Sequence, residues 1–234
     1  EKVEYIKSNC KKVVLSRVTD VILEDFPNMN NVFNNMLKGE KCYHILLKNK
    51  DDTWISNTPE SLFRRHNNTI IIESIAGTVP KVKNEEQNKI NKELLLNDTK
   101  LIEEQQIVVD WFYQQINDVS KEINILPVEI IDCGYVYHRK NNITIELNDN
   151  ISNIDIIQKL HPSPAICGYP YNESNKIIKS IEEHKRELYT GCIGYENEED
   201  SEFAVMIRIC KNSKNSNIIS LYTGGGIIKD SKPS

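Results

Sequence analysis

The sequence predicts a mixed α/β (α+β) fold in which mainly antiparallel sheets pack with helices, and three features support this. Apolar residues recur at helical spacing, with acids and amides between them, over residues 85–122 and 173–187. Short segments rich in β-branched and aromatic residues surround these helices. Strands and helices alternate irregularly, and short polar turns join several strands. That pattern is typical of antiparallel sheets and unlike a doubly wound parallel sheet.

Capping residues and proline mark the helix ends. Within residues 85–122, Asn97 and Asp98 predict a break and the cap of a second helix. A shorter helix is expected over residues 153–160 and should stop at His161, because a residue that precedes proline avoids the helical region. The predicted core face of the helix over residues 173–187 consists of Ile177, Ile178 and Ile181.

The expected strands are short and bounded by polar turns. The polar stretch at residues 211–217 is interpreted as the loop of a hairpin formed by the last two strands. The expected strands are residues 13–15, 43–47, 69–72, 134–138, 143–147, 203–210 and 218–222.

The composition limits the classes of protein to consider. The chain has 234 residues, 39% of them hydrophobic, which suffices for one sizeable core. The formal net charge of -5 argues against a nucleic-acid partner. No apolar run is long enough to span a bilayer and residues 1–12 contain no signal-peptide core, so we expect an intracellular protein without a membrane partner. The 6 cysteines form no CxxC pair, which predicts reduced thiols and no zinc site.

A series of short motifs follows one another along almost the whole chain. Together, in this order, they resemble the chorismate-binding enzyme family, which includes isochorismate synthase, salicylate synthase, anthranilate synthase component I and aminodeoxychorismate synthase. The resemblance implies the family's fold, with residues 1–234 as one incomplete catalytic domain. The motifs are KVVLSR at 12–17, TPESLFR at 58–64, IAGT at 75–78, KLIEE at 100–104, LHPSPAICG at 160–168, RELYTG at 186–191, IR at 207–208 and YTGGGI at 222–227.

The subfamily is indicated mainly by one segment. HPSPAICG at residues 161–168 resembles the HPTPAxxG signature of isochorismate synthases, whereas the anthranilate and aminodeoxychorismate enzymes typically carry a PxGxxxGxP-type segment there. Within the family, a lysine at the position of Lys12 goes with enzymes that use water as the nucleophile. The resemblance therefore implies an isomerase that converts chorismate into isochorismate, by adding water at C2 and expelling the C4 hydroxyl.

This reaction needs a base that activates water and an acid that protonates the leaving hydroxyl. The resemblance implies Lys12 as the base and Glu60 as the acid. A lysine ordinarily titrates near about 10.4, so burial or cationic neighbours have to lower its pKa. Glu60 has to stay protonated, which requires an apolar site or a second negative charge. Taken without the resemblance, Lys12 is an ordinary residue at a strand edge and Glu60 a solvated turn residue. Glu73 is a rival carboxylate, expected to be a surface or supporting group.

The resemblance also implies a magnesium cofactor. Mg²⁺ prefers hard oxygen ligands, and Glu104 matches the family's first metal glutamate. Lys100, four residues earlier, distinguishes it from the neighbouring Glu103. Taken without the resemblance, a glutamate on an amphipathic helix belongs to its solvated face.

The implied substrate contacts combine an arginine fork, a phenol and a glycine run. Arg208 offers a planar fork suited to a carboxylate. Glycines permit close backbone approach and amide donation to an anion, although the family usually has alanine at the position of Gly225. His161 is expected to hold its loop through a ring hydrogen bond. The implied substrate-binding residues are Gly77, Thr78, His161, Ala165, Ile166, Tyr189, Arg208, Gly224, Gly225 and Gly226.

The chain departs from the family at its ends. After the position of Ser234 the family continues with a segment of the type E-x-x-E-T-x-x-K that completes the magnesium site, and further strands precede the position of Glu1. We therefore expect residues 1–234 alone to bind magnesium weakly and to show little turnover. Fusion to further biosynthetic domains is one way the polypeptide could continue.

Three functions stay open at this stage. The first is an isochorismate synthase core. The second is another chorismate enzyme, with salicylate synthase, which adds pyruvate elimination, the nearest. The third is a non-catalytic remnant or binding module with the same fold. The only partner implied is the small-molecule substrate chorismate, and the product could serve menaquinone, siderophore or salicylate biosynthesis.

Overall fold

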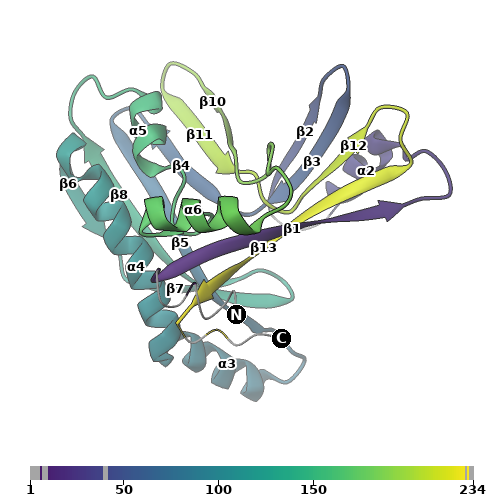
Figure 1. Cartoon of the computed structure of the whole chain (residues 1–234). Helices are drawn as coiled ribbons and strands as arrows, with labels where there is room; N and C mark the ends of the chain where they lie inside the picture. Colours follow the sequence, from purple (N-terminus) through teal and green to yellow (C-terminus); the bar gives the residue numbers. More distant parts are fainter. Residues whose placement is uncertain (1–5, 7–9, 39–41, 230, 232–234) are drawn as a thin grey trace. The chain divides into compact units, whose positions relative to one another are not determined.

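The structure is a computed structural model that describes residue 6 and residues 10–38, 42–229 and 231 (Figure 1). It confirms the predicted fold class, since helices pack with two sheets whose strand pairs are mainly antiparallel. The chain divides into two compact units. The first consists of Glu1–Pro59, Pro162–Gly191 and Val205–Ser234, and the second of Glu60–His161 and Cys192–Ala204.

The first unit contains a 6-stranded sheet with the order β2-β3-β12-β13-β1-β9. Its longest pairing joins β1 to β13 without interruption, from Lys12 opposite Ile228 to Ile22 opposite Ile218. The strands are β1 (Lys12–Ile22), β2 (Tyr43–Lys48), β3 (Asp52–Thr58), β9 (Gly168–Tyr169), β12 (Ile209–Ser213) and β13 (Ile218–Ile228). The helices of this unit are α2 (Met29–Met36) and α6 (Tyr171–Ile181).

Helix α6 covers β1, as Figure 1 shows. Ile177 and Ile178 are buried against Val13, and Ile181 packs at the margin of the same cluster. The predicted apolar face of this helix is therefore confirmed. Since side chains alternate along a strand, α6 contacts the face of β1 that carries Val13 and Leu15. The opposite face, which carries Lys12, is described with the candidate site.

The second unit contains a 7-stranded sheet with the order β10-β11-β4-β5-β8-β6, and β7 also pairs with β8. Its strands are β4 (Ser61–His66), β5 (Thr69–Pro80), β6 (Ser120–Ile125), β7 (Glu129–Asp132), β8 (Val136–Leu147), β10 (Cys192–Glu196) and β11 (Asp200–Val205). Its helices are α3 (Glu85–Asn97), α4 (Thr99–Ile116), α5 (Asn153–Leu160) and the short 3₁₀ helix η1 (Asn117–Val119).

Helix boundaries in the second unit follow the capping signals. The Asp98 side chain accepts a hydrogen bond from the N–H of Leu101 at 3.0 Å, which confirms the predicted break between α3 and α4. In α5, Ser152 and Asp155 form a reciprocal capping box. That helix ends at Leu160, as the following His161-Pro162 pair predicts.

Two predicted helices are too long. The segment 85–122 leaves the helical conformation after Ile116, because Ser120–Ile125 pairs with β8 as strand β6. The segment 173–187 ends at Ile181, because Glu182 and Arg186 bond to β1 and do not continue the helix. In both cases tertiary contacts override the local helical pattern.

Two strand predictions are also wrong in detail. Residues 134–138 and 143–147 belong to one strand, β8, because its polar middle finds partners: Arg139 bonds to Gln105 and Asn141 to the carbonyl of Leu126. The predicted strand at residues 203–210 is two strands in different sheets, β11 and β12. They separate where Arg208 adopts φ = 48°.

The hairpin between β12 and β13 is confirmed, with a loop shorter than residues 211–217. The prediction of one catalytic domain over residues 1–234 stays a prediction. The 6 cysteines are free thiols. No helix within the described ranges is long and apolar enough to cross a membrane.

Candidate functional site

In the first unit, Lys12, Gly224 and Gly226 lie on one face of the β1–β13 ladder. Lys12 and Ser16 lie on the same face of β1, and Gly224 and Gly226 lie on the corresponding face of β13. A Cβ atom added at Gly226 would lie 3.4 Å from Cε of Lys12. The half-buried Lys12 side chain therefore extends over a part of β13 that has no side chains.

Two of the three glycine amides point to an open strand edge. The N–H groups of Val14 and Ser16 bond away from β13, to the Cys167 carbonyl at 2.9 Å and to Oε1 of Glu182 at 2.8 Å. Because bonded and non-bonded pairs alternate in an antiparallel ladder, their partners Gly226 and Gly224 direct their amides away from β1.

The other edge of β13 pairs with β12 only as far as Tyr222. Both of these amides can therefore meet a ligand, whereas the N–H of Gly225 points toward Leu15 and belongs to the ladder. Only Gly224 and Gly226 thus fit the predicted amide donation to an anion.

Tyr189 lies against the first of these glycines. A Cβ atom at Gly224 would lie 2.3 Å from the Tyr189 hydroxyl oxygen, so only glycine admits the phenol at this place. The Tyr189 ring also stacks on Tyr222, with centroids 5.7 Å apart. Burial raises the pKa of Tyr189, and burial together with the Glu187 carboxylate raises the pKa of Tyr222 to about 12. Both phenols are therefore neutral hydrogen-bond donors near neutral pH.

The two loops beside this face carry strained backbone. Glu187, Thr190 and Arg208 adopt φ values of 50°, 62° and 48°. Such conformations cost non-glycine residues about 1–3 kcal/mol each and concentrate at functional sites. Two backbone hydrogen bonds of 2.8 Å join the loops, from Thr190 to Met206 and from Met206 to Gly191. Tyr189 and the exposed Arg208 thus lie on two connected, strained loops.

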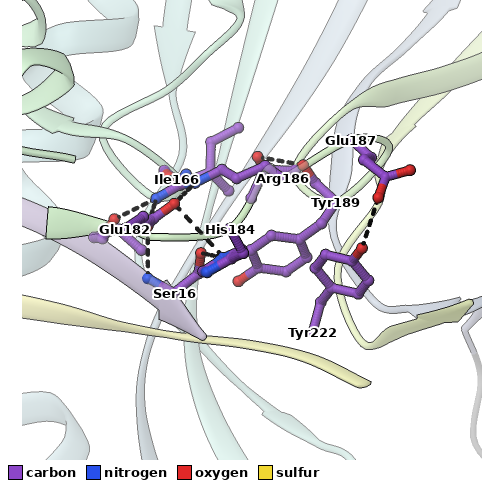
Figure 2. A network of polar contacts seen from close by, with 10 residues as sticks. Ser16, Ile166, Glu182, His184, Arg186, Glu187, Tyr189 and Tyr222 are labelled. Carbon is purple, nitrogen blue, oxygen red and sulfur yellow. Dashed lines mark hydrogen bonds and ion pairs between the residues drawn. The ribbon is translucent and has the colours of Figure 1, made fainter. Parts of the chain in front are cut away.

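An ion pair caps the free edge of β1, as Figure 2 shows. Arg186 donates to both oxygens of Glu182, at 2.9 Å and 2.6 Å. It also donates to the carbonyls of Ile166 at 2.8 Å and of Val14 at 2.7 Å. Glu182 in turn accepts the N–H of Ser16. The pair thereby satisfies backbone groups that an unpaired strand edge would leave exposed, and it holds the turn that carries Ala165 and Ile166.

The charge of this carboxylate is stabilised in the folded protein. The Glu182 side chain is only 4% exposed. Burial alone would raise its pKa, but the hydrogen bonds and charge of Arg186, together with the Ser16 N–H, outweigh burial and lower the pKa below 4.5. His184 adds a hydrogen bond from its ring to the Ser16 hydroxyl at 2.9 Å.

In the second unit, Gly77 and Thr78 occupy a bulge of β5. The pairing register with β8 shifts between Ala76 and Thr78, and Gly77 adopts φ = 67° there. His138 lies opposite Thr78, with its Nδ1 3.0 Å from the Thr78 hydroxyl and 3.2 Å from the Gly77 carbonyl. The bulge therefore gathers a hydroxyl, a carbonyl and an imidazole.

A buried network fixes α4, the helix of Glu104. Arg139, 8% exposed, donates to Oε1 of Gln105 at 2.5 Å and to the carbonyls of Leu95 and Leu96. Gln105 in turn donates to the Ser74 carbonyl at 2.9 Å. Gln105 follows Glu104 directly, so the network sets the rotation of the helix at the predicted metal ligand. The side chain of Glu104 lies outside the described residues. No group of three or more His, Cys, Asp or Glu side chains gathers within the described part of the chain.

Glu60, Glu73 and His161, the remaining predicted residues of the second unit, differ in their burial and in their polar contacts. Glu60 is half-buried and lies between β3 and β4. Glu73, the rival carboxylate, forms ion pairs of 2.9 Å with Arg64 and Lys140, which fits the expected supporting role. The predicted ring hydrogen bond of His161 is wrong for Nδ1, because this buried nitrogen has no partner among the described residues. Burial lowers the pKa of His161, so its ring is neutral near neutral pH.

Sequence reasoning did not single out His138, Glu182 or Arg139. His138 lies within a predicted strand segment, but its contact with Thr78 spans 60 positions and depends on the register of β5 and β8. The sequence predicts a helix that includes Glu182, and it presents Arg186 only as part of the RELYTG motif. A carboxylate and an arginine four residues apart gave the one local signal for the Glu182–Arg186 pair.

Comparison with known proteins places the chain in a family. The model of the chorismate binding enzyme family matches residues 2–234. The chain is 29% identical over 236 residues to isochorismate synthase MenF of Haemophilus influenzae, covering 99% of this chain and 54% of that protein. It is 29% identical over 185 residues to anthranilate synthase component 1 of Neisseria meningitidis serogroup B, covering 76% of this chain and 37% of that protein.

Among solved structures, the chain resembles MenF, the menaquinone-specific isochorismate synthase from Escherichia coli. The TM-score is 0.90 at 27% identity, covering 99% of this chain and 55% of that one. The protein therefore belongs to the chorismate-binding enzyme family. The chain spans about half the length of the isochorismate synthases that it matches.

The contact between Gly224 and Tyr189 predicts a specific double-mutant result. Gly224→Ala should lower the free energy of unfolding by about 2 kcal/mol, because the added methyl group overlaps the Tyr189 hydroxyl. In a Tyr189→Phe background the nearest ring atom is Cζ, at 3.5 Å, so most of this cost should disappear. Urea denaturation of the four proteins measures the coupling.

Gly225→Ala is the matched control, because nothing lies within 4 Å of a Cβ atom there. Its effect should stay within about 0.5 kcal/mol. If Gly224→Ala lowers the free energy of unfolding equally in the wild-type and Tyr189→Phe backgrounds, Tyr189 does not lie against this glycine.

The Glu182–Arg186 pair predicts a pH-dependent stability. Glu182→Gln should destabilise the protein by about 3 kcal/mol at neutral pH, because it leaves the Arg186 charge buried without a counter-ion. A carboxyl whose folded pKa is lowered stabilises the protein above its unfolded pKa, and this contribution is lost as the pH falls through the folded value. The difference in the free energy of unfolding between wild type and Glu182→Gln should therefore become smaller below pH 4.5. Denaturation at several pH values measures it, with exposed Glu183→Gln as the control. A difference that stays constant with pH would contradict the assignment.

Proposed function

We propose that this protein takes part in the conversion of chorismate into isochorismate, as an isochorismate synthase or its core. The observation that carries the proposal is the Lys12 amine lying over a bare strand with two outward amides, those of Gly224 and Gly226. Such an arrangement suits an anionic substrate that approaches the backbone closely. The similarity to isochorismate synthases along nearly the whole chain supports the same activity.

The first unit contains groups that can bind carboxylates. Chorismate carries two carboxylate groups, and a guanidinium matches a carboxylate with two parallel hydrogen bonds. Arg208 lies on the strained loop that is bonded to the Tyr189 loop. We propose that Arg208, Tyr189 and the two outward amides bind substrate carboxylates, with Ala165 and Ile166 as apolar contacts.

We assign the proton transfers to Lys12 and Glu60. Lys12 in its neutral form would take a proton from the water that attacks C2. Glu60 in its protonated form would give a proton to the C4 hydroxyl as it leaves. Both residues are half-buried, so each keeps one side exposed for contact with a substrate.

The bulge of the second unit supplies further polar groups. Thr78 and His138 share a hydrogen bond, and we propose that one or both contact the substrate. The Nδ1 atom of His161 supports its assignment as a binding residue, because a buried nitrogen without a partner costs free energy unless a ligand or water satisfies it.

Magnesium remains part of the proposal, with Glu104 as one ligand. The oxygen of a carboxylate suits this hard cation, and the Gln105–Arg139 network supports a fixed helix at this position. A single carboxylate would hold the ion weakly. When bound, the cation would hold the ring carboxylate of the substrate and withdraw charge from the ring.

We propose water and not ammonia as the nucleophile because of the segment at residues 161–168 and because of Lys12. The similarity to an anthranilate synthase component makes the ammonia-dependent reaction the alternative that a test has to separate. Incubation of the complete natural protein with chorismate, Mg²⁺ and an ammonium salt, followed by chromatography, distinguishes isochorismate from salicylate plus pyruvate and from anthranilate. Salicylate or anthranilate as the main product would overturn the proposal.

The assigned roles predict the effects of two substitutions. Lys12→Ala and Glu60→Gln should each reduce product formation by about 10²–10⁴-fold while leaving the fold intact, because each removes one proton-transfer group. Exposed Lys11→Ala is the matched control and should retain activity. Normal turnover in Lys12→Ala or in Glu60→Gln would reject the role given to that residue.

The metal assignment predicts a change in magnesium dependence. Glu104→Ala should raise the Mg²⁺ concentration needed for half-maximal activity by at least about 10-fold, because it removes a first ligand. Exposed Glu103→Ala, one position earlier on the helix, should leave the requirement unchanged. Magnesium titrations of the two variants compare them directly, and identical curves would reject Glu104 as a ligand.

A further inference from the structure

We infer that Arg186, oriented by Glu182, is a positioning residue that fixes the spacing of the substrate-contacting segments of the first unit. The expected effect on catalysis rests on the proposed function. The geometric part of the inference rests on the contacts of the Arg186 guanidinium group. Arg186 is assigned no contact with the substrate. It acts through the three segments that it joins.

Two of the three segments come from other parts of the chain, and the third, which carries Tyr189, follows Arg186 in the same loop. Nη2 donates to the carbonyl of Val14, between Lys12 and Ser16 on β1. Nη1 donates to the carbonyl of Ile166, in the turn that the HPSPAICG segment forms. The guanidinium carbon lies 6.0 Å from the centre of the Tyr189 ring. One side chain thus contacts the strand of the proposed base and two segments with proposed substrate contacts.

The planar shape of the guanidinium makes these contacts interdependent. Its donors have fixed directions, so a bond to one carbonyl sets the direction of the bonds to the others. The ammonium of a lysine carries the same charge on a flexible stem and cannot bond to two carbonyls and a carboxylate in this geometry. The spacing of the segments therefore depends on arginine at this position, and charge alone does not replace it.

Glu182 fixes the orientation of the fork. Both of its oxygens accept from Arg186, and Oε1 also accepts the N–H of Ser16. Ser16 lies opposite Gly224 in the ladder. Rotation of the Arg186 fork would therefore break its bond to the Val14 carbonyl and its bonds to the carboxylate that accepts the Ser16 N–H, and so disturb the strand pair that presents the outward amides.

Small displacements at these segments have large kinetic consequences. A shift of about 1 Å in a positioned group costs about 100-fold in rate. The Arg186→Lys variant should therefore lower kcat/KM for chorismate by about 10–100-fold in the folded protein. A purely structural role would instead lower the folded fraction and leave kcat/KM of the folded molecules unchanged.

The test compares Arg186→Lys with Lys185→Gln, its exposed neighbour, in the complete natural protein. Thermal unfolding and circular dichroism establish the folded fraction, and kcat and KM are then measured per folded molecule. Amide hydrogen exchange at Ser16, whose N–H bonds to Glu182, gives a readout that needs no activity. Arg186→Gln, which lacks the charge, shows whether lysine rescues any function.

The inference predicts a loss of kcat/KM and faster exchange at Ser16 in Arg186→Lys, little rescue relative to Arg186→Gln, and wild-type behaviour in Lys185→Gln. A kcat/KM within twofold of wild type in Arg186→Lys would overturn it. If the wild-type protein converts no chorismate, the proposed function fails separately. In that case, amide exchange at Ser16 in Arg186→Lys still tests whether Arg186 positions β1. An exchange rate equal to that of the wild type would overturn the positioning role.

Discussion

The first unit depends on the long antiparallel pairing of β1 and β13. This ladder places the proposed base on one strand and the bare glycine stretch on the other, in a register that holds from Lys12 to Ile22. On one face it is supported by the apolar residues of α6. At the free edge of β1 it is supported by the Glu182–Arg186 pair. Lys12 lies on the face of β1 opposite the one that packs against α6.

Much of this arrangement could be predicted from local sequence. The fold class, the cap at Asp98, the end of α5 and the core face of α6 all follow from residues that are neighbours in the chain. The motifs added residue assignments that no local pattern could give, since Lys12 and Glu60 are unremarkable charged residues in their own segments. The resemblance was needed to connect them with a reaction.

The features that were missed depend on partners far away in the sequence. The helix that was expected to continue to Glu187 ends at Ile181, because Glu182 and Arg186 bond to a strand more than 160 positions earlier. The polar middle of β8 resembled a turn because the partners of Arg139 and Asn141 lie on other elements. The break at Arg208 was hidden because a left-handed arginine leaves no signal in a run of β-branched residues.

The early end of the β12–β13 pairing at Tyr222 has a consequence for how this sequence can change over time. Beyond that point β13 keeps its pairing with β1 and runs through the three glycines to Ile227, which packs against the apolar cluster that includes α6. At the hairpin tip, Lys214 and Asn215 are exposed, so other side chains can replace theirs without overlap. At Gly224 a side chain would overlap the Tyr189 hydroxyl, and at Gly226 it would meet the Lys12 side chain. Gly224 and Gly226 therefore tolerate substitution less well than the exposed tip of the hairpin does.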